Sequence, residues 1–576
     1  MQADEFDVVV LGTGAAGMVA ALAAHDAGAT VGIFEKAEVI GGTTALSGGV
    51  CWLPCNHLAA EAGLLDSRED ALTYLRALSH GLISDELAEA LVDGTGPVLD
   101  FLETQAGLQF QLLPIPDYHA ERPGGKPRGG RSIEPTTTAF DELGDWGSRI
   151  GIGQFSDPIT GDVYLTTLDS PRGGGSGRID AAELERRRVR RINGRGRGMI
   201  GGLLKACLSR GIEPVTGARA TELLTEGGQV TGVRILAQAG TREVLARRGV
   251  ILATGGFEWD AELCASFLRG PMRHPASIPT NTGDGLKMAM RVGAKLGNMR
   301  EAWWMPAAII PGVQQYGEQK VALILRERAL PATIMVNRHG KRFVNEATNY
   351  NAIAGAFHHL DPVQFEYGNL PCWIVFDSRM VREFGFLDVA AGGDMPAWVP
   401  SAPTLAALAQ QLGIPAAALE DTVARWNNNV ATGSDPDFAR GDSAYDGFNG
   451  DITHYPGKES TLGPIGAAPF YALPLESSTL GTKGGPRTNR HAAVLDVDGH
   501  PHPRPVRGRQ RDGRPHRHGV RWRRRHTGPG DRVWICGRAA CCNEDIIGLG
   551  GRIPIQDNHL NGARAVERNR ARPPTD

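Results

Sequence analysis

The first 36 residues contain the feature that most constrains the fold of this chain. Residues Asp7–Lys36 read DVVVLGTGAAGMVAALAAHDAGATVGIFEK: an apolar run, a glycine-rich turn, an Ala/Leu-rich stretch and a second apolar run ending at Glu35. This order predicts a buried parallel strand, a tight turn, a helix over Ala15–Ala27 and a second parallel strand. Such a unit is typical of adenine dinucleotide binding, because the N–H groups at the helix N-terminus hold the pyrophosphate.

Each glycine of the turn has its own expected role. Gly12 allows the tight turn, Gly14 lets the backbone approach the pyrophosphate, and Gly17 lets the helix pack closely against the strand. Glu35 is placed to accept hydrogen bonds from the ribose hydroxyls. The other expected cofactor contacts in this unit are Ala15, Ala16 and Lys36.

A second glycine-rich signature, GGTTALSGG at Gly41–Gly49, follows directly and indicates that the dinucleotide is FAD. Further along, GVILATGGFE at Gly249–Glu258 predicts a buried strand that returns beneath the flavin, and a turn follows at Thr282–Gly285. Asp284 in that turn either approaches the FAD or simply belongs to a capped turn. The expected FAD contacts in these segments are Gly42, Thr43, Thr44, Ser47, Gly48, Gly49, Ala253, Thr254, Gly255 and Asp284.

The composition is ordinary for a globular protein, with 41% hydrophobic residues, 22% charged residues and a net charge of −3. This balance gives no reason to expect a nucleic-acid partner. The sequence has no 18-residue apolar run that would predict a membrane span, and no signal peptide is apparent. The eight cysteines lack the paired spacing of a zinc site, so we expect reduced thiols, no metal and a cytoplasmic location.

The middle of the chain changes in character and predicts a separate domain. Two stretches, Thr404–Leu412 and Ala416–Asn428, have the apolar periodicity of amphipathic helices, and PFYALPLESSTLGTKGG at Pro469–Gly485 is expected to resume the first domain. We therefore predict an α/β protein: a doubly wound, Rossmann-like FAD-binding domain with an inserted α+β substrate (cap) domain. The predicted boundaries are 1–295 and 460–503 for the FAD-binding domain, 296–459 for the cap domain and 504–576 for an Arg-rich C-terminal segment.

Five segments occur in an order that resembles a known family. GGTTALSGG, ATGGFE, GKRFVNEATNY, PFYALPL and GTKGGPRT follow one another as in the 3-ketosteroid dehydrogenases (3-oxosteroid Δ1- or Δ4(5α)-dehydrogenases). These enzymes belong to the FAD-dependent fumarate reductase/succinate dehydrogenase flavoprotein superfamily. The resemblance covers about residues 1–500 and implies FAD-dependent dehydrogenation of ring A of a steroid, in steroid degradation. It also implies an electron acceptor such as a quinone or a dye, and it leaves peripheral membrane association open.

The resemblance also implies two catalytic tyrosines. Tyr118, in PDYHAERPGG, is similar to the first tyrosine of the Δ1 enzymes, and Tyr350, at the end of NEATNY, is similar to the second. Tyr350 would be the base that removes a proton from C2, while the flavin N5 accepts the hydride from C1. Because a phenol with a pKa of about 10 is a poor base at neutral pH, Tyr350 would need a hydrogen bond from Tyr118 or a lowered pKa. The alternative for each tyrosine is a packed or surface aromatic.

Other activities stay open at this point. The Δ4(5α) reaction is the nearest alternative, followed by a fumarate-reductase-like reduction of an enone or alkene, and by a flavin-binding remnant without activity. A dicarboxylate reductase needs His and Arg groups that clamp its substrate. The sequence contains His119, His274, His358 and Arg342, but no arrangement fixes them as a clamp, so we expect them to be solvated surface groups.

The C-terminal segment departs from the family pattern. Residues His500–Trp534 are dense in Arg, His, Pro and Gly and have no apolar periodicity. A basic nucleic-acid or membrane tail and a disordered insertion are two interpretations. We favour a third, a shifted reading frame, because G/C-rich codons read one base later from Arg504 can give GLYAAGN and the tyrosine–glycine motif that the family requires. A one-base discrepancy is expected near codons 501–504, and the chain as written would lack the group that polarises the C3 carbonyl.

Overall fold

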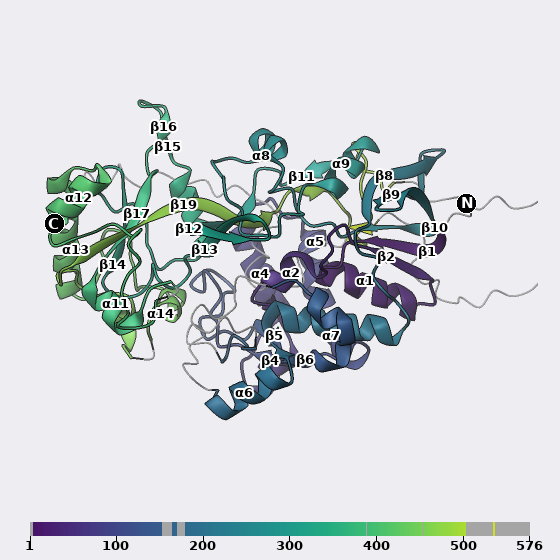
Figure 1. The fold of residues 1–576 in the computed structure, drawn as a ribbon, viewed down its shortest axis with the longest axis horizontal. Helices are drawn as coiled ribbons and strands as arrows, with labels where there is room; N and C mark the ends of the chain where they lie inside the picture. The colour runs from purple at the N-terminus through teal and green to yellow at the C-terminus, as the bar shows by residue number, and fades with distance from the viewer. Residues whose placement is uncertain are drawn as a thin grey trace, which may run out of the picture.

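The computed structural model describes residues 4–152, 164–169, 179–387, 389–452, 454–502 and 534–535. In Figure 1 these residues form two lobes: strands β1, β2, β8, β9 and β10 lie on the right, and strands β12, β14, β17 and β19 lie on the left. Each lobe is built on a six-stranded sheet. The first lobe contains parallel strands with helices, and the second contains an antiparallel sheet with helices, so the α/β class with an inserted α+β part is observed.

The first lobe begins with the predicted strand–turn–helix–strand unit. Strands β1 (Asp4–Leu11) and β2 (Val31–Phe34) run parallel, and helix α1 (Ala15–Asp26) connects them. Strand β10 (Gly240–Leu252) lies parallel to β1 on its other side, which gives the order β2-β1-β10 of a doubly wound sheet. Val10 has no exposed surface, as expected for a strand that is covered on both faces.

The sheet continues beyond its parallel part. β9 (Gln229–Ala237) pairs antiparallel with β10, and β8 (Arg219–Glu226) pairs antiparallel with β9. Near the C-terminal end of β10, residues Trp534–Ile535 form strand β21, which runs parallel to β10. β21 falls in the predicted C-terminal segment, residues 504–576. The rest of this segment lies outside the described residues, so the structure does not test the shifted-frame hypothesis.

An apolar core lies between the sheet of the first lobe and its helices. Helix α7 (Arg195–Ser209) packs against α1, and its Leu203 joins Met18 and Leu22 in this core. The other elements of the lobe are α2 (Gly42–Leu46), β3 (Cys51–Trp52), α3 (His57–Glu61), α4 (Arg68–Ser79), α5 (Asp85–Thr104), β4 (Phe110–Leu112), β5 (Ser132–Pro135), β6 (Thr138–Ala139), a 3-10 segment (Asp141–Arg149), α6 (Ala181–Val189), β7 (Ile192–Asn193), α8 (Ala261–Phe267) and α9 (Asp284–Arg291).

The second lobe has a sheet of order β13-β12-β19-β17-β14, with all neighbours antiparallel. Side chains of β14 alternate between its two faces: Ile334 joins one apolar cluster and Met335 the other. Helices α12 (Leu405–Leu412) and α13 (Ala416–Ala431) cover the first face, and α10 (Tyr350–Phe357) covers the second. The two helices expected in this domain are therefore present. The remaining elements are β12 (Ala302–Gln315), β13 (Glu318–Leu323), β14 (Thr333–Asn337), β15 (Leu360–Asp361), β16 (Glu366–Tyr367), β17 (Cys372–Asp377), α11 (Ser378–Phe384), β18 (Ser401–Ala402), α14 (Ala444–Asn449) and a 3-10 segment (Gly457–Ser460). The short strands β11 (Leu296–Gly297) and β20 (Gly485–Pro486) pair with each other.

Strand β19 (Phe470–Thr482) differs from its expected assignment. We assign Pro469–Gly485 to the FAD-binding domain, but β19 pairs with β17, β18 and β12 and so belongs mainly to the second lobe. The strand has 13 residues. Most of them belong to the sheet of the second lobe, and the last residue contacts the first lobe. There Thr482 Oγ1 accepts a hydrogen bond from Phe257 N at 2.9 Å. Among the described residues, no helix is long and apolar enough to cross a membrane.

Candidate active site

The glycine turn after β1 combines tight packing with an open space. A Cβ atom on Gly12 would lie 2.3 Å from Ala253 O, and one on Gly17 would lie 2.1 Å from Gly12 O, so neither position has room for a side chain. A Cβ atom on Gly14 would lie no closer than 3.5 Å to any neighbour, and that neighbour is the Thr44 hydroxyl. The first N–H groups of α1 have no partner within the helix and border this space. A pyrophosphate group fits these conditions.

Glu35 directly follows β2 beside this turn, and its carboxylate already accepts hydrogen bonds. Glu35 Oε2 accepts hydrogen bonds from Thr13 N at 3.1 Å and from Thr13 Oγ1 at 2.7 Å, and Oε1 accepts from Ala37 N at 3.0 Å. The Thr13 hydroxyl also accepts from Gly41 N at 3.0 Å, which joins the two glycine-rich segments. Thr13 is a link that the sequence did not single out. Since a carboxylate offers about four lone-pair sites, contact of Glu35 with a ribose stays a prediction.

The second glycine-rich segment folds against the start of α1. Thr44 Oγ1 accepts a hydrogen bond from Ala15 N at 3.2 Å, and Thr43 Oγ1 accepts from Asn281 Nδ2 at 3.0 Å. The segment therefore lies along the same open space as Gly14. Contact with the cofactor stays a prediction for the other residues of these segments and of the loop after β10, namely Ala16, Gly42, Ser47, Gly48, Gly49, Ala253, Thr254 and Gly255.

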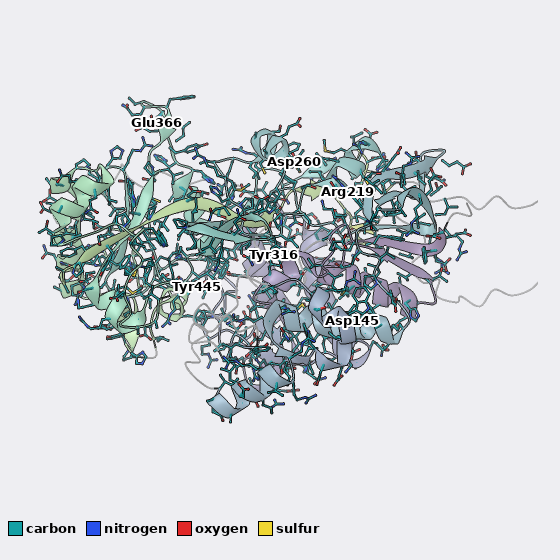
Figure 2. All side chains as sticks on the ribbon, viewed as in Figure 1. Asp145, Arg219, Asp260, Tyr316, Glu366 and Tyr445 are labelled. Carbon is teal, nitrogen blue, oxygen red and sulfur yellow. The ribbon has the colours of Figure 1, made fainter. Side chains whose placement is uncertain are left out.

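Two cations hold the acid of the Thr282–Gly285 turn. Lys36 Nζ donates to Asp284 Oδ2 at 2.9 Å, and Arg219 Nη2 donates to Asp284 Oδ1 at 2.8 Å. Burial alone would raise the pKa of Asp284, but the hydrogen bonds from Arg219 and Lys36 hold this pKa below its usual value. Figure 2 labels Arg219 in the first lobe, close to β8. Both oxygens of the Asp284 carboxylate therefore already accept hydrogen bonds within the protein. Contact of Lys36 or Asp284 with FAD stays a prediction.

The loop after β10 carries a buried carboxylate that sequence reasoning missed. Glu258, the last residue of ATGGFE, is 2% exposed, and its Oε1 accepts from Ser277 Oγ at 2.6 Å and from Asn281 Nδ2 at 2.7 Å. Its Oε2 accepts from Thr482 N at 3.2 Å. Glu258 thus joins the first lobe to the end of β19. An acid at the end of an apolar, glycine-rich motif was the signal that could have identified it.

The two predicted catalytic tyrosines meet where the lobes join. Tyr118 comes from the loop between β4 and β5, and Tyr350 is the first residue of α10. Their side chains are buried, and the ring centroids lie 5.9 Å apart in an edge-to-face arrangement. The apolar side chains of the same cluster come from both lobes and include Leu113, Ile115, Ala276, Met305 and Leu323.

A third tyrosine, Tyr445 of α14, extends this cluster. Its ring centroid lies 4.8 Å from that of Tyr118, again edge to face. Figure 2 shows Tyr445 on the side of the second lobe that faces the first. Sequence reasoning missed Tyr445, because nothing in SAYDGFNG distinguishes it from a surface aromatic.

The loop that carries Tyr118 is fixed by its preceding residue. Asp117 accepts hydrogen bonds from Arg131 Nη1 at 2.8 Å and from Trp52 Nε1 at 2.7 Å. The Arg131 side chain is 1% exposed, and it also forms an ion pair with Asp66 at 2.8 Å. A buried, hydrogen-bonded ion pair of this kind restricts the backbone on which Tyr118 lies.

The structure corrects the expectation that the His and Arg groups are solvated. The Arg342 side chain is 5% exposed and is paired with Glu346 at 2.7 Å. Burial, with Arg269 nearby, lowers the pKa of His358 to about 3. His119 is partly buried and hydrogen-bonded, and His274 pairs with Glu476 at 2.7 Å. The sequence contained no signal for this burial, because the covering groups come from distant segments.

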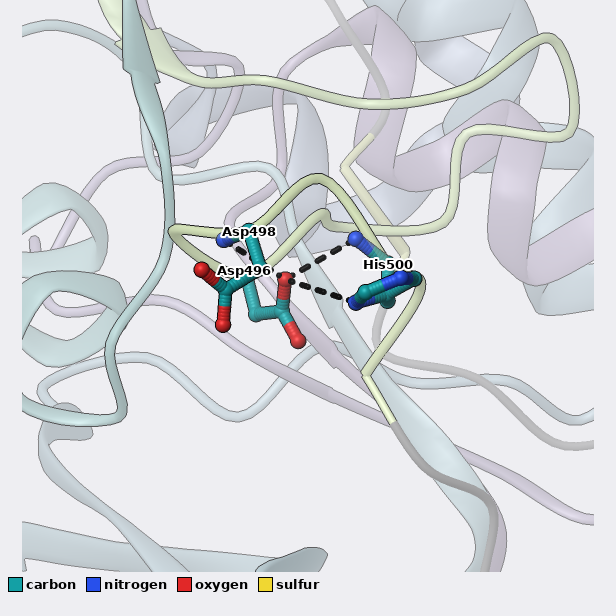
Figure 3. A group of neighbouring side chains, drawn as sticks. All are labelled: Asp496, Asp498 and His500. Carbon is teal, nitrogen blue, oxygen red and sulfur yellow. Dashed lines mark hydrogen bonds and ion pairs between the residues drawn. The ribbon is translucent and has the colours of Figure 1, made fainter.

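Three polar groups near the end of the described chain approach one another closely enough to suggest a cation site. Figure 3 shows Asp496, Asp498 and His500 on one loop. Asp496 Oδ1 accepts hydrogen bonds from Asp498 N at 3.0 Å and from His500 N at 2.8 Å. These bonds are those of a tight Asx turn, which explains the grouping without a metal.

The chain is similar to several known proteins. Residues 7–503 match the family model described as "FAD binding domain". The chain is 40% identical over 505 residues to 4-oxocyclohexanecarboxylate 2-dehydrogenase of Sinomonas cyclohexanicum, covering 86% of each protein. It is 35% identical over 529 residues to 3-oxosteroid 1-dehydrogenase of Mycobacterium tuberculosis, covering 87% of this chain and 91% of the relative. The crystal structure of 3-ketosteroid Δ1-dehydrogenase from Sterolibacterium denitrificans, in complex with 1,4-androstadiene-3,17-dione, has a TM-score of 0.81 at 29% identity and covers 95% of both chains.

These matches and the glycine-turn geometry define the class: the chain belongs to the FAD binding domain family, and FAD is its cofactor. It is an FAD-dependent oxidoreductase of the kind that acts on CH–CH bonds. More narrowly, it is an FAD-dependent dehydrogenase. The family match ends at residue 503, next to the boundary that we predict at 504.

Proposed function

We propose that this enzyme introduces a double bond next to the ring carbonyl of a cyclic ketone, and that its substrate is a 3-ketosteroid oxidised at the Δ1 position. The observation that carries the proposal is the buried contact between Tyr118 and Tyr350 at the junction of the lobes. Similarity to a 3-oxosteroid 1-dehydrogenase at 35% identity, and to the steroid-bound structure at a TM-score of 0.81, supports the steroid as substrate.

The chemistry requires a base for the proton next to the carbonyl, an acceptor for the hydride on the adjacent carbon, and a donor that polarises the carbonyl, which the shifted-frame hypothesis assigns to the sequence after residue 503. Bound FAD supplies the hydride acceptor at its N5. Tyr350 removes the proton from C2 as the phenolate and becomes the neutral phenol, and its edge-to-face contact with the Tyr118 ring restricts the direction of the Tyr350 side chain. The apolar side chains around the two rings exclude water and favour an apolar ring system.

A second candidate substrate is 4-oxocyclohexanecarboxylate, which the relative at 40% identity is named for. The same tyrosines would act next to its ring ketone, but its carboxylate would need a cation. Arg328 is fully buried, and its Nη1 donates to Thr348 O at 2.6 Å, two residues before Tyr350. Its Nη2 has no hydrogen-bond partner in the described part of the chain, so Arg328 offers a donor of the required charge.

Anaerobic bleaching of the FAD absorbance tests the proposal. The FAD-loaded protein is mixed with a 4-ene-3-one steroid, a 5α-saturated 3-ketosteroid or 4-oxocyclohexanecarboxylate, and each product is identified. We expect bleaching by the 4-ene-3-one with formation of the 1,4-diene. A 4-ene formed only from the 5α-saturated ketone would establish the Δ4(5α) reaction, bleaching by the carboxylate alone would establish the second candidate, and bleaching by none would overturn the proposal.

A pair of variants tests the role of the base. Tyr350→Phe removes the phenol oxygen that accepts the proton, so the bleaching rate should fall by about 10²- to 10⁴-fold. Tyr455→Phe is the matched control, because its hydroxyl lies at the surface beside Glu383. Bleaching by Tyr350→Phe at the wild-type rate would refute the role of Tyr350 while leaving the substrate assignment intact.

A further inference from the structure

A hydrogen bond that the proposed chemistry does not use joins the two tyrosine-bearing segments. Asn349 Nδ2 lies 3.1 Å from His119 Nε2, although the two residues are 230 positions apart in the sequence. Asn349 directly precedes Tyr350, and His119 directly follows Tyr118. The bond therefore links the backbone positions next to both tyrosines.

The cap of helix α10 fixes the direction of this bond. Asn349 is the N-cap residue, and its Oδ1 accepts from Ala352 N at 3.0 Å. Since the amide oxygen is used at the cap, the atom that faces His119 is the NH2 group, which can only donate. His119 Nε2 must therefore be the acceptor. The ring proton is then on Nδ1, and the imidazole is uncharged.

The surroundings of His119 favour this neutral form. Burial, reinforced by Arg122 on the same loop, holds the pKa of His119 below its usual value, while Glu121 acts in the opposite direction. From α4, the Tyr74 hydroxyl accepts a hydrogen bond from His119 N at 3.2 Å. Protonation of the ring would place a second N–H donor against the NH2 group of Asn349, and the hydrogen bond between the two residues would be lost.

We propose that His119 and Asn349 are positioning residues, whose hydrogen bond sets the contact between Tyr118 and Tyr350 only while His119 is neutral. The inference rests on the proposed role of the two tyrosines. Without this bond, the loop of Tyr118 and the start of α10 can shift relative to each other. A displacement of about 1 Å at a reacting group costs about 10²-fold in rate, and we expect this loss in kcat rather than in KM.

Other contacts keep the lobes together when this bond is broken. Ala444 N, at the start of α14, donates to Glu121 Oε1 at 2.8 Å, and Tyr445 packs against Tyr118. Both contacts hold the Tyr118 loop from its other side. Variants of His119 or Asn349 should therefore fold and bind FAD, so their effect on catalysis can be measured.

Three substitutions separate the positioning role from the cap. Asn349→Asp keeps an oxygen for the cap bond to Ala352 N but presents an acceptor to His119, whereas His119→Gln keeps an amide oxygen that cannot titrate. Thr404→Asp is the matched control: Thr404 caps α12 in the same lobe, accepts from Ala407 N at 3.1 Å and is solvent-exposed. Thr404→Asp therefore places a carboxylate at the N-cap of a helix, as Asn349→Asp does, but at a position with no histidine beside it in the described part of the chain.

The first readout is the rate of FAD bleaching by the substrate as a function of pH. We expect the wild type to lose activity as the pH falls, because protonation breaks the hydrogen bond. Asn349→Asp should lack the acid loss that comes from His119, because both the neutral ring with its proton on Nε2 and the protonated ring can donate to the new carboxylate. His119→Gln should lose only the part of the acid loss that titrates with His119 and keep the part that comes from protonation of the base Tyr350, and Thr404→Asp should follow the wild type.

The second readout needs no substrate: thermal unfolding of the FAD-loaded protein, followed by flavin fluorescence. A folded-state pKa below the unfolded value of about 6.5 means that the unfolded chain binds more protons, so the contribution of His119 to stability falls as the pH falls below about 6.5. Asn349→Asp should reverse this sign, because the new carboxylate raises the pKa of His119. Its stabilisation is then present below about pH 6.5 and is lost as the pH rises through the raised pKa.

The outcomes are distinguishable from failure of the proposed function. If no cyclic ketone bleaches the wild type, the proposed function fails, yet the unfolding series still decides whether His119 is a neutral acceptor. If Asn349→Asp follows Thr404→Asp in both readouts at every pH, the cap alone explains Asn349, and the positioning role is overturned.

Discussion

We expect alanine at the two glycines near the start of α1, Gly14 and Gly17, to have different effects. In Gly17→Ala, the new Cβ atom would lie 2.1 Å from the backbone oxygen of Gly12, so the helix has to move away from the strand. In Gly14→Ala, the nearest atom is the Thr44 hydroxyl at 3.5 Å, and the backbone angles of φ −64° and ψ 172° suit alanine. The first change should therefore affect the fold, and the second should affect FAD binding.

The magnitudes follow from these distances. Overpacking against backbone costs about 3 kcal/mol, and alanine regains about 1 kcal/mol of helix propensity, so Gly17→Ala should lower the free energy of unfolding by about 2 kcal/mol. For Gly14→Ala, a gain of about 0.4–1 kcal/mol from the stiffer unfolded chain roughly offsets the poorer N-cap. The methyl group occupies the space for the pyrophosphate, and one lost charge-assisted hydrogen bond of about 1.5–3 kcal/mol weakens FAD binding by about 10- to 150-fold.

Urea unfolding at several FAD concentrations separates the two effects. The intrinsic free energy of unfolding is independent of FAD, while the binding contribution grows with the logarithm of the free FAD concentration divided by Kd. Gly17→Ala should lower the intrinsic value, and Gly14→Ala should raise Kd. Wild-type FAD affinity in Gly14→Ala would refute the position that we assign to the pyrophosphate, and wild-type stability in Gly17→Ala would refute the packing argument.

Three further predictions concern the hydrogen-bonded and ionic contacts. Arg131→Met leaves the buried carboxylate of Asp117 without its cation, so urea unfolding should show a loss of about 3–5 kcal/mol, which Asp117→Asn in the same chain should partly restore. The hydrogen bond from Arg247 lowers the pKa of Asp7 to about 2, so its stabilisation is complete above the unfolded value of about 3.9 and is lost as the pH falls through about 2. The Tm difference between the wild type and Arg247→Ala should therefore be constant above about pH 5 and should narrow below about pH 4. Glu258→Gln turns an amide group toward hydrogen-bond donors and should cost about 1–3 kcal/mol in urea unfolding, a result that full wild-type stability would contradict.

Local patterns were sufficient to predict the strand–turn–helix–strand unit that begins the first lobe. The glycine turn, the helix after it and the two parallel strands lie within residues 4–34, and their order along the chain determines how they pack. The assignment of β19 to the first lobe was wrong because local sequence does not determine which strands pair. Its sequence predicts an extended strand, but which strands it pairs with depends on β12 and β17, which come from distant parts of the chain.

Some residues of the candidate site could be recognised from short sequence segments, and others only from contacts between distant segments. Tyr118 and Tyr350 were recognisable from short segments, whereas Tyr445 was not, because its role comes only from contact with Tyr118. The residues that fix the two tyrosines are their sequence neighbours: Asp117 anchors one, and Asn349 caps the helix that begins with the other. In this site these two anchoring residues are adjacent in sequence to the tyrosines, whereas Arg131 and His119, which bond to them, come from other segments. Asp117 and Asn349 could therefore be named from the sequence as candidates that position the two tyrosines. Their hydrogen-bond partners could be identified only from the fold.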